Sequence, residues 1–398
     1  MIKSLTTSLL LLLLLTGCQS ETTPETPTPE KPAQPTELTL GTKLSIHSNN
    51  LNENRPIIIS LPKDYATSKA HYPVLYLTDG LQNIWHVMGT IEVLSRTGSV
   101  PPMIVVGIES KDRIRDFTLT TSENHPGSGG GKKFLNFIES ELIPYVDSHY
   151  RTNSFKVLEG HSLGGLFAAS TLLEKPNLFD GFIIMSPALW WNGEALTQTA
   201  EPFFKNHPDL DKALFFGIGT YESGTDYGMR KELKNFVDVL EQNRPKNVRF
   251  QRKEMEQEGH MSSTLLSNYY GLKFIFSDMK FPKTFYDAYS DAAFLEHENA
   301  IMAKYGAAAK QSAELYVSLA SMLRQETRYS EAITVLKRSV EAYPFDVGLM
   351  NFLGNTYELD HNTEGAIQTY KQAIATSKRY HYNREEEFEA QIERLTKK

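Results

Sequence analysis

The feature that most constrains the fold is the segment Glu159-Gly-His-Ser-Leu-Gly-Gly165. It follows the apolar run Phe155–Leu158 and precedes a stretch with helical apolar spacing, Leu163–Ser170. Glycines on both sides of Ser162 permit a tight turn in which the chain passes close to its neighbours. A serine at such a strand–turn–helix junction projects its hydroxyl above the sheet. We therefore predict that Ser162 occupies a nucleophile elbow and is a catalytic nucleophile.

Short apolar runs alternate with longer amphipathic stretches through the middle of the chain. The apolar runs, typical of strands buried on both faces, are Val74–Leu77, Met103–Val106, Phe155–Leu158, Gly181–Met185 and Leu214–Ile218. The amphipathic stretches are Asn83–Ser95, Gly131–Tyr150, Leu163–Leu173 and Met229–Gln242. This alternation predicts an α/β fold with a mostly parallel sheet. Two earlier strand candidates, 37–46 and 55–62, lack an intervening helix and predict an antiparallel edge.

Composition excludes several classes of function. The 398 residues include 41 basic and 48 acidic side chains, a net charge of −7 spread along the chain, which argues against a nucleic-acid partner. The single cysteine excludes an internal disulfide and cysteine-based metal clusters. We expect neither a metal nor a cofactor, and no apolar run reaches the ~20 residues of a membrane-spanning helix.

The N-terminus has the pattern of an export signal. Lys3 precedes the apolar run Leu9–Leu15, and Leu15-Thr-Gly-Cys18 resembles the lipobox of bacterial lipoproteins. The resemblance implies removal of residues 1–17, lipidation of Cys18 and anchoring in a membrane. Gln19 resembles the sorting residue of outer-membrane lipoproteins, which places the protein in the bacterial cell envelope. The alternative is an ordinary secretory signal with a chance cysteine.

The remaining chain divides into four predicted parts. Residues 18–36, rich in Pro, Thr and Glu, form an extended tether. Residues 37–282 form an α/β-hydrolase domain, residues 283–303 a helical connector, and residues 304–398 a repeat region with a capping helix.

The C-terminal region contains a 34-residue period. Leu319-Ala320, Leu323, Ala332 and Leu336 recur as Leu353-Gly354, Tyr357, Ala366 and Tyr370. This pattern resembles the tetratricopeptide repeat, which implies stacked helix pairs suited to a protein partner. The alternatives are an ordinary helical bundle and a helical region that packs onto the hydrolase domain and shapes its active-site rim.

The order of residues along the chain selects the partners of Ser162. In α/β-hydrolases the acid and then the histidine follow the nucleophile. Of the 11 histidines, His260 fits best, because it lies in a loop after the strand candidate 248–253. The acid should follow the run Leu214–Ile218, where Glu222 is nearest and Asp226 is the alternative. The acid would orient the imidazole and stabilise its charged form.

Two backbone N–H groups are expected to form an oxyanion hole. One belongs to Leu163, which follows the nucleophile, and the other to Leu81, which follows the strand Val74–Leu77. Trp190 and Trp191 follow another strand end, and we expect them either to line a substrate pocket or to pack in the core.

Five ordered segments carry a family resemblance. They are Tyr72–Gly80, Val105–Ile108 with Arg115-Asp116, Phe134–Pro144, Gly160–Gly165 and Ser186–Trp191. Together they resemble the putative esterase (esterase D-like) family over about residues 38–282. That family includes siderophore esterases of the enterochelin type, S-formylglutathione hydrolases and mycolyltransferases. The resemblance implies a serine carboxylic-ester hydrolase, and some siderophore esterases resemble Ser–His dyads, in which Glu222 would be dispensable.

The predicted function is therefore a lipid-anchored serine esterase that cleaves a small-molecule ester through an acyl-enzyme. Siderophores, plant-polysaccharide esters and acyl-transfer substrates remain open. A different class of function is a tetratricopeptide scaffold that carries a vestigial hydrolase domain.

Overall fold

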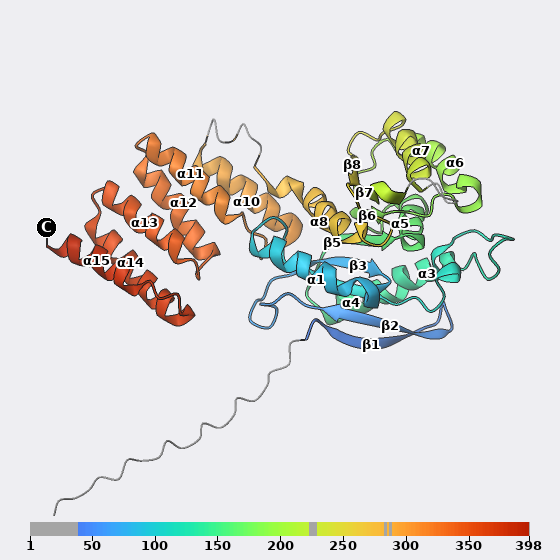
Figure 1. Cartoon of the computed structure of the whole chain (residues 1–398), viewed down its shortest axis with the longest axis horizontal. Coiled ribbons are helices and arrows are strands. Elements are labelled where there is room, and N and C mark those ends of the chain that lie inside the picture. Colours follow the sequence, from blue (N-terminus) through green and yellow to red (C-terminus); the bar gives the residue numbers. More distant parts are fainter. Residues whose placement is uncertain (1–38, 223–228, 282–284, 286–288, 398) are drawn as a thin grey trace, which may run out of the picture. The chain divides into compact units, whose positions relative to one another are not determined.

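The computed structural model describes residues 39–222, 229–281, 285 and 289–397. Its centre is an eight-stranded sheet in the order β1-β2-β4-β3-β5-β6-β7-β8 (Figure 1). The strands are β1 (Thr42–Ser48), β2 (Glu53–Ser60), β3 (Tyr72–Thr78), β4 (Ile104–Ile108), β5 (Thr152–His161), β6 (Gly181–Met185), β7 (Ala213–Gly219) and β8 (Arg249–Met255). β1 pairs antiparallel with β2, β2 pairs antiparallel with β4, and all other neighbours are parallel. The predicted mostly parallel sheet with an antiparallel edge is confirmed.

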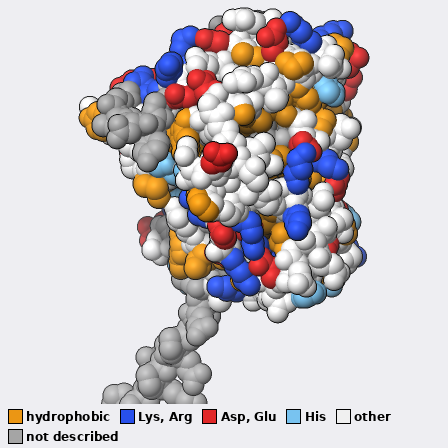
Figure 2. All heavy atoms as spheres, turned by 90° about the vertical axis from the view of Figure 1, so that its right-hand side faces the viewer, with side chains coloured by type: hydrophobic (Ala, Val, Ile, Leu, Met, Phe, Trp, Pro, Cys, Tyr) orange, Lys and Arg blue, Asp and Glu red, His pale blue; other side chains and the backbone are white. Residues whose placement is uncertain are grey.

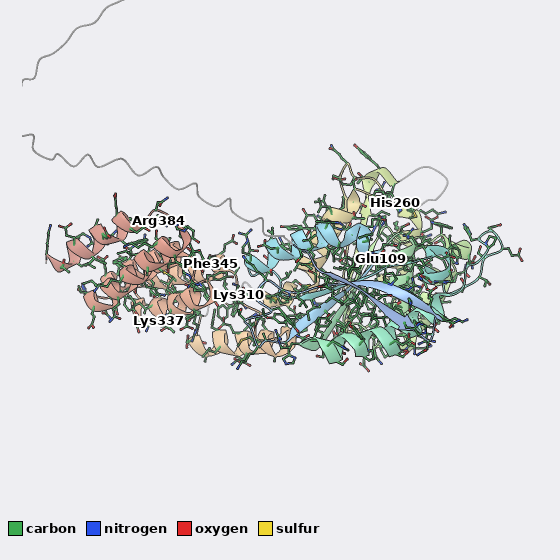
Figure 3. The ribbon with its side chains drawn as sticks, turned by 90° about the horizontal axis from the view of Figure 1, so that it is seen from below. Glu109, His260, Lys310, Lys337, Phe345 and Arg384 are labelled. Atoms are coloured by element: carbon green, nitrogen blue, oxygen red, sulfur yellow. The ribbon has the colours of Figure 1, made fainter. Side chains whose placement is uncertain are left out.

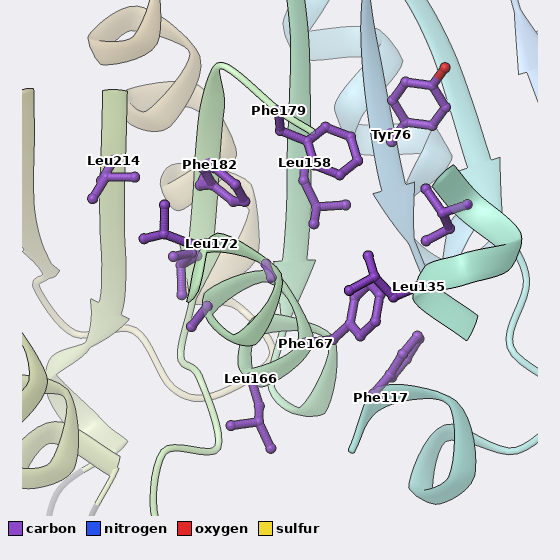
Figure 4. Packing of buried hydrophobic residues seen from close by; sticks show 14 of the residues in the cluster. Tyr76, Phe117, Leu135, Leu158, Leu166, Phe167, Leu172, Phe179, Phe182 and Leu214 are labelled. Carbon is purple, nitrogen blue, oxygen red and sulfur yellow. The ribbon is translucent and has the colours of Figure 1, made fainter. Parts of the chain in front are cut away.

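Helices cover both faces of the sheet and bury its apolar side chains. One face packs against α2 (Arg113–Phe117), α3 (Gly131–Phe137), α4 (Ile143–His149), α5 (Leu163–Glu174), α6 (Trp191–Asn206) and α7 (Met229–Gln242). Figure 4 shows part of this core, where Leu158 of β5 lies near Phe167 of α5. The other face packs against α1 (Gly80–Arg96) and α8 (Ser263–Ile275). Strands buried on both sides explain the continuous apolar runs in the sequence.

The stretch 131–150, predicted as one helix, has an irregular centre. α3 and α4 are joined by a π-helical turn at Ile138–Leu142. Pro144 follows this turn and has no N–H to donate to a carbonyl of the preceding turn. The regular hydrogen-bond ladder is therefore interrupted at this point.

The C-terminal region is helical. Its helices are α10 (Asp291–Tyr305), α11 (Ala313–Gln325), α12 (Tyr329–Ala342), α13 (Val347–Leu359), α14 (Thr363–Tyr380) and α15 (Glu385–Thr396). From α11 onward each helix packs against the next and shares a third apolar core. Helix starts also recur with the sequence period, at 313 and 347 and at 329 and 363.

The end of α10 is part of the hydrolase core. Tyr305 packs its ring 4.9 Å from that of Phe155 in β5 and donates its hydroxyl to Asp278 at 2.6 Å. Ile301 lies buried in the same cluster. The predicted boundary between residues 303 and 304 therefore lies within α10, and the connector packs against the sheet.

Several predictions concern residues that the structure does not describe. The export signal, Cys18 and the tether fall within residues 1–38, outside the described ranges. Among the described helices, none combines the length and apolar character needed to span a bilayer.

Candidate active site

Ser162 occupies a strained turn between β5 and α5. Its backbone has φ 60° and ψ −118°, a region that non-glycine residues rarely adopt and that costs about 1–3 kcal/mol. A Cβ atom on Gly160 would lie 2.1 Å from the Gly164 carbonyl oxygen, and one on Gly164 would lie 2.4 Å from Thr78 Oγ1. The strand–turn–helix context predicted for Ser162 is present. Gly160 is required by a close approach of the backbone, and Gly164 by close packing against the Thr78 side chain.

The structure brings His260 and Glu222 together. His260 Nδ1 lies 2.8 Å from Glu222 Oε2, and the Glu222 side chain is almost fully buried. An imidazole that donates from Nδ1 carries a free lone pair on Nε2, which can accept a proton. Glu222 lies in the short 3-10 turn Thr220–Glu222 directly after β7. Asp226, the alternative acid, lies within 223–228, outside the described residues.

The second oxygen of Glu222 receives hydrogen bonds of its own. Oε1 accepts from Ser186 Oγ at 2.7 Å, from the Gly219 N–H at 2.8 Å and from Ser263 Oγ at 3.3 Å. Burial alone would raise the pKa of Glu222, but the bonds from His260, Ser186 and Gly219 hold that pKa below its usual value. The carboxylate is therefore charged at neutral pH. Sequence reasoning did not single out Ser186, although it follows β6 directly and lies in one of the segments that carry the family resemblance.

His161 ties the His260 loop to the elbow. Its Nε2 donates to the backbone oxygen of His260 at 2.7 Å, and the two rings lie 4.4 Å apart. Burial, followed by the proximity of His260, lowers the pKa of His161 to about 4. A neutral His161 keeps this donor over the physiological range, so it holds the loop that carries His260 against the elbow residue that precedes Ser162.

The two predicted oxyanion donors lie at helix starts. Leu163 is the first residue of α5, so its N–H has no acceptor within the helix. Leu81 lies in the first turn of α1, but its N–H donates to the carboxylate of Glu109, the residue after β4. The sequence analysis did not identify Glu109.

A bidentate ion pair adjoins the oxyanion side of the elbow. Arg113 Nε and Nη2 donate to the two carboxylate oxygens of Asp79 at 2.9 and 3.1 Å. Arg113 Nη2 also reaches the backbone oxygen of His161 at 3.4 Å. Asp79 adopts φ 52° immediately before α1, so the pair holds the loop that presents Leu81. A second ion pair joins Arg115 and Asp116, which lie in one of the segments that carry the family resemblance, at 2.7 Å.

The two tryptophans differ in environment. Trp191 is 4% exposed and donates its indole N–H to Thr120 Oγ1 at 3.1 Å, so it is a packed residue. Trp190 is partly buried against the same core, 5.9 Å from the ring of His125. Core packing, one of the two expectations, describes Trp191.

Metal ligands do not cluster in the described part of the chain. Within those ranges, no group of three or more His, Cys, Asp or Glu side chains is arranged to hold a metal ion.

Charges of both signs are interspersed on the face of the molecule drawn in Figure 2, with hydrophobic side chains between them.

Comparison with known proteins identifies the family. The family model described as putative esterase matches residues 48–264, more than half of the chain. The chain belongs to this family. Membership supports a hydrolase of ester bonds, and the α/β-hydrolase-like fold agrees with it.

Individual curated relatives are similar to this chain over about half of its length. The ferri-bacillibactin esterase BesA of Bacillus subtilis is 29% identical over 249 residues, 56% of this chain and 85% of that protein. A siderophore triacetylfusarinine C esterase of Aspergillus fumigatus is 29% identical over 44% of this chain and 66% of its own length.

A solved structure shares the fold over a larger part of the chain. The structure of an IroE-like serine hydrolase from Shewanella oneidensis superposes with a TM-score of 0.62 at 26% identity, and covers 76% of this chain and 98% of its own.

Proposed function

We propose that the protein is a serine hydrolase that cleaves carboxylic esters through a Ser162–His260–Glu222 triad. The observation that carries the proposal is the 2.8 Å contact between His260 and a buried, charged Glu222 beside the strained Ser162 turn. Relatives described as esterases support the same chemistry.

In the proposed reaction, Ser162 Oγ attacks the ester carbonyl while His260 Nε2 takes its proton. The oxyanion is stabilised by the Leu163 N–H, by the Leu81 N–H once it is released, and by the positive end of α5. His260 then protonates the departing alcohol, which leaves an acyl-enzyme. Water, activated by His260, hydrolyses this intermediate. Glu222 keeps the imidazole oriented and stabilises its charged form without taking the proton.

Siderophore esters are the substrate class that we propose. Both curated relatives reported above act on siderophores according to their names. Large exposed apolar side chains also lie in the same loops and helix starts as the proposed catalytic groups. Tyr221 and Met261 neighbour Glu222 and His260 in the chain, Leu81 and Trp85 lie in α1, and Leu265 lies at the start of α8. Exposed apolar side chains of this kind suit a bulky ester with aromatic or acyl parts. The same relatives do not favour a scaffold with a vestigial hydrolase domain.

Covalent labelling tests the nucleophile. A fluorophosphonate probe should label the wild-type protein, and Ser162→Ala should lose both labelling and p-nitrophenyl ester turnover while keeping its melting temperature. A folded Ser162→Ala variant with wild-type turnover would exclude the assignment. A panel of tricatecholate lactones, feruloyl sugars, acetyl sugars and simple acyl esters then tests the substrate class through kcat/KM.

We also propose that Cys18 carries a lipid and that the protein is anchored in the bacterial envelope, in the outer membrane. The lipobox-like Leu15-Thr-Gly-Cys18 supports this proposal. Metabolic labelling with an alkyne fatty acid should tag the wild type, and Cys18→Ala should lose the tag and leave the membrane fraction. Equal labelling of both proteins would exclude it.

We propose an accessory, partner-binding role for the helices from α11 onward, as in tetratricopeptide-like repeats. Their 34-residue periodicity and their shared apolar core, which also includes Phe294 of α10, support this role. A chain that ends after Gln311 retains α10, whose Ile301 and Tyr305 belong to the hydrolase core. This chain should keep its small-ester kinetics. Aggregation or loss of activity would show that the repeats stabilise the enzyme itself.

A further inference from the structure

The N–H group of Leu81 is occupied by a carboxylate from within the protein. β3 and β4 are parallel neighbours, and their register pairs Thr78 with Ile108. The chain therefore leaves both strands at the same point of the sheet edge. Leu81 and Glu109 meet there, and the Leu81 N–H donates to Glu109 Oε1. Figure 3 labels Glu109 and His260 in the sheet-containing part of the molecule.

Arg55, a cation close to Glu109, uses its guanidinium for other partners. Arg55 donates to the backbone oxygen of Glu109 at 2.8 Å, while its guanidinium is paired with Asp116 and Glu53. Lys43 of β1, Arg55 of β2 and Asp79 before α1 are the charged groups that act on the carboxylate. Burial raises the pKa of Glu109, and Asp79 adds to this effect, whereas the Leu81 N–H, Lys43 and Arg55 oppose it.

The chemistry of this contact matches that of an oxyanion hole. An oxyanion hole binds a negatively charged oxygen through backbone N–H groups at a helix start. The carboxylate of Glu109 is such an oxygen, and it lies on the N–H that the proposed mechanism assigns to the substrate. Asp79, the residue at the N-terminal cap of α1, makes no side-chain capping bond and is paired with Arg113. Glu109 is thus the side chain that reaches this N–H.

We propose that Glu109 is an internal mimic of the reaction's oxyanion, which occupies half of the oxyanion hole in the free enzyme. The inference rests on the proposed esterase function. The substrate carbonyl must displace the carboxylate from Leu81 before the ester can react. The carboxylate therefore competes with small esters for the Leu81 N–H. A substrate that gains binding energy from contacts elsewhere on the surface can displace the carboxylate more easily.

Glu109→Gln tests the proposal. The neutral amide oxygen can still accept the hydrogen bond but does so more weakly than a carboxylate. At pH 8, kcat/KM for p-nitrophenyl acetate and the rate of fluorophosphonate inactivation should each rise about tenfold. Glu256→Gln removes the same charge from an exposed position in the His260 loop and should leave both values unchanged.

The pH profile separates this role from a purely structural one. Protonation of Glu109 in the wild type weakens the same contact as the substitution does. The ratio of variant to wild-type kcat/KM should therefore be largest at high pH and approach one as Glu109 becomes protonated. A residue that only caps α1 would lower the melting temperature without this change in ratio.

A second variant keeps the test informative if Glu109→Gln folds poorly. Glu109→Asp retains the charge but is one methylene shorter, so it should release Leu81 and also raise kcat/KM. Variants that are folded and no faster than the wild type at pH 8 overturn the inference. A wild type that does not react with fluorophosphonate would instead contradict the proposed function, so the two failures can be told apart.

Discussion

The two flanks of the elbow hold carboxylates whose pKa values shift in opposite directions. On the flank formed after β7 and β8, Glu222 is almost fully buried, yet its pKa is lowered. On the flank formed after β3 and β4, burial raises the pKa values of Asp79 and Glu109, despite an ion pair with Arg113 and a backbone donor. The comparison shows that the balance between burial and the hydrogen bonds and charges around each carboxylate decides the direction of the pKa shift.

This difference fits the proposed chemistry. The flank with His260 needs a permanent negative charge, because an imidazolium forms beside it during the reaction. The opposite flank must stabilise a charge that appears only in the transition state, so a fixed charge there competes with the substrate. In the proposed mechanism, one edge of the sheet would thus hold one carboxylate that supports catalysis and one that restrains it.

The largest expected effect on activity comes from Glu222, on the flank formed after β7 and β8. Glu222→Gln should lower kcat by about 10³–10⁴-fold, because the neutral amide no longer favours the productive imidazole tautomer. Steady-state kinetics with p-nitrophenyl acetate measures the effect, and Asp226→Asn is the matched control. A greater loss in Asp226→Asn would reassign the acid. If neither substitution has an effect, the enzyme works as a Ser–His dyad.

A carboxyl in the strand that leads into the elbow extends the comparison, because among the described residues one side chain, Asn268, donates to it. Glu159 in β5 is fully buried, and both of its oxygens accept from Asn268 Nδ2, at 3.0 and 2.8 Å. Burial raises its pKa from 4.5 to about 8, against the opposing hydrogen bond from Asn268. The folded protein therefore keeps a proton that the unfolded chain releases, and it loses stability as the pH rises from about 4.5 to about 8.

Glu159→Gln removes this pH-dependent cost. Its amide can donate to Asn268 Oδ1, a buried atom without a hydrogen-bond partner among the described residues, once the Asn268 amide rotates. The variant should gain about 2–4 kcal/mol in unfolding free energy, relative to wild type, between pH 5 and pH 9. Urea unfolding at both pH values measures this gain, with the exposed Glu256→Gln as a control that should show none. If the variant and the wild type differ in unfolding free energy by the same amount at pH 5 and at pH 9, Glu159 is ionised in the folded protein at both pH values.

The smallest expected effect concerns one donor to Glu222. Ser186→Ala removes the 2.7 Å bond to Oε1 but leaves the Gly219 N–H and the His260 contact. A fall in kcat/KM of about three- to tenfold is expected. Because the donors lower the pKa of Glu222, losing one raises it, and activity should be lost at a higher pH on acidification. The exposed Ser140→Ala should behave as wild type, and an unshifted acidic limb for Ser186→Ala would show that Ser186 does not control Glu222.

Local sequence patterns were sufficient for much of the site. The glycines around Ser162 predicted the elbow, because the tight turn and its close neighbours leave no room for a larger residue there. The chain order of nucleophile, acid and histidine predicted that Glu222 and His260 would meet, and the structure brings them into contact. Their catalytic roles remain predictions, as do the lipid on Cys18 and the nature of the repeats.

The residues that hydrogen-bond to Glu222, Asp79 and Leu81 could not be predicted from local sequence patterns. Ser186, Arg113 and Glu109 have no distinctive local pattern, since each is an ordinary polar residue after a strand or in a short helix. Their contacts with Glu222, Asp79 and Leu81 span 36, 34 and 28 residues of sequence.

Residue periodicity and local backbone geometry were enough to predict the α/β alternation, the elbow and the order of the catalytic candidates. The direction in which the pKa of each carboxylate shifts depends instead on the tertiary structure. β4 lies between β2 and β3, and this placement puts Glu109 on Leu81. The packing of α8 against β6 and β7 brings Asn268 to Glu159 across 109 residues. The pKa of a buried carboxyl follows from its burial and its hydrogen-bond donors, and here these come from strands and helices far apart in the chain.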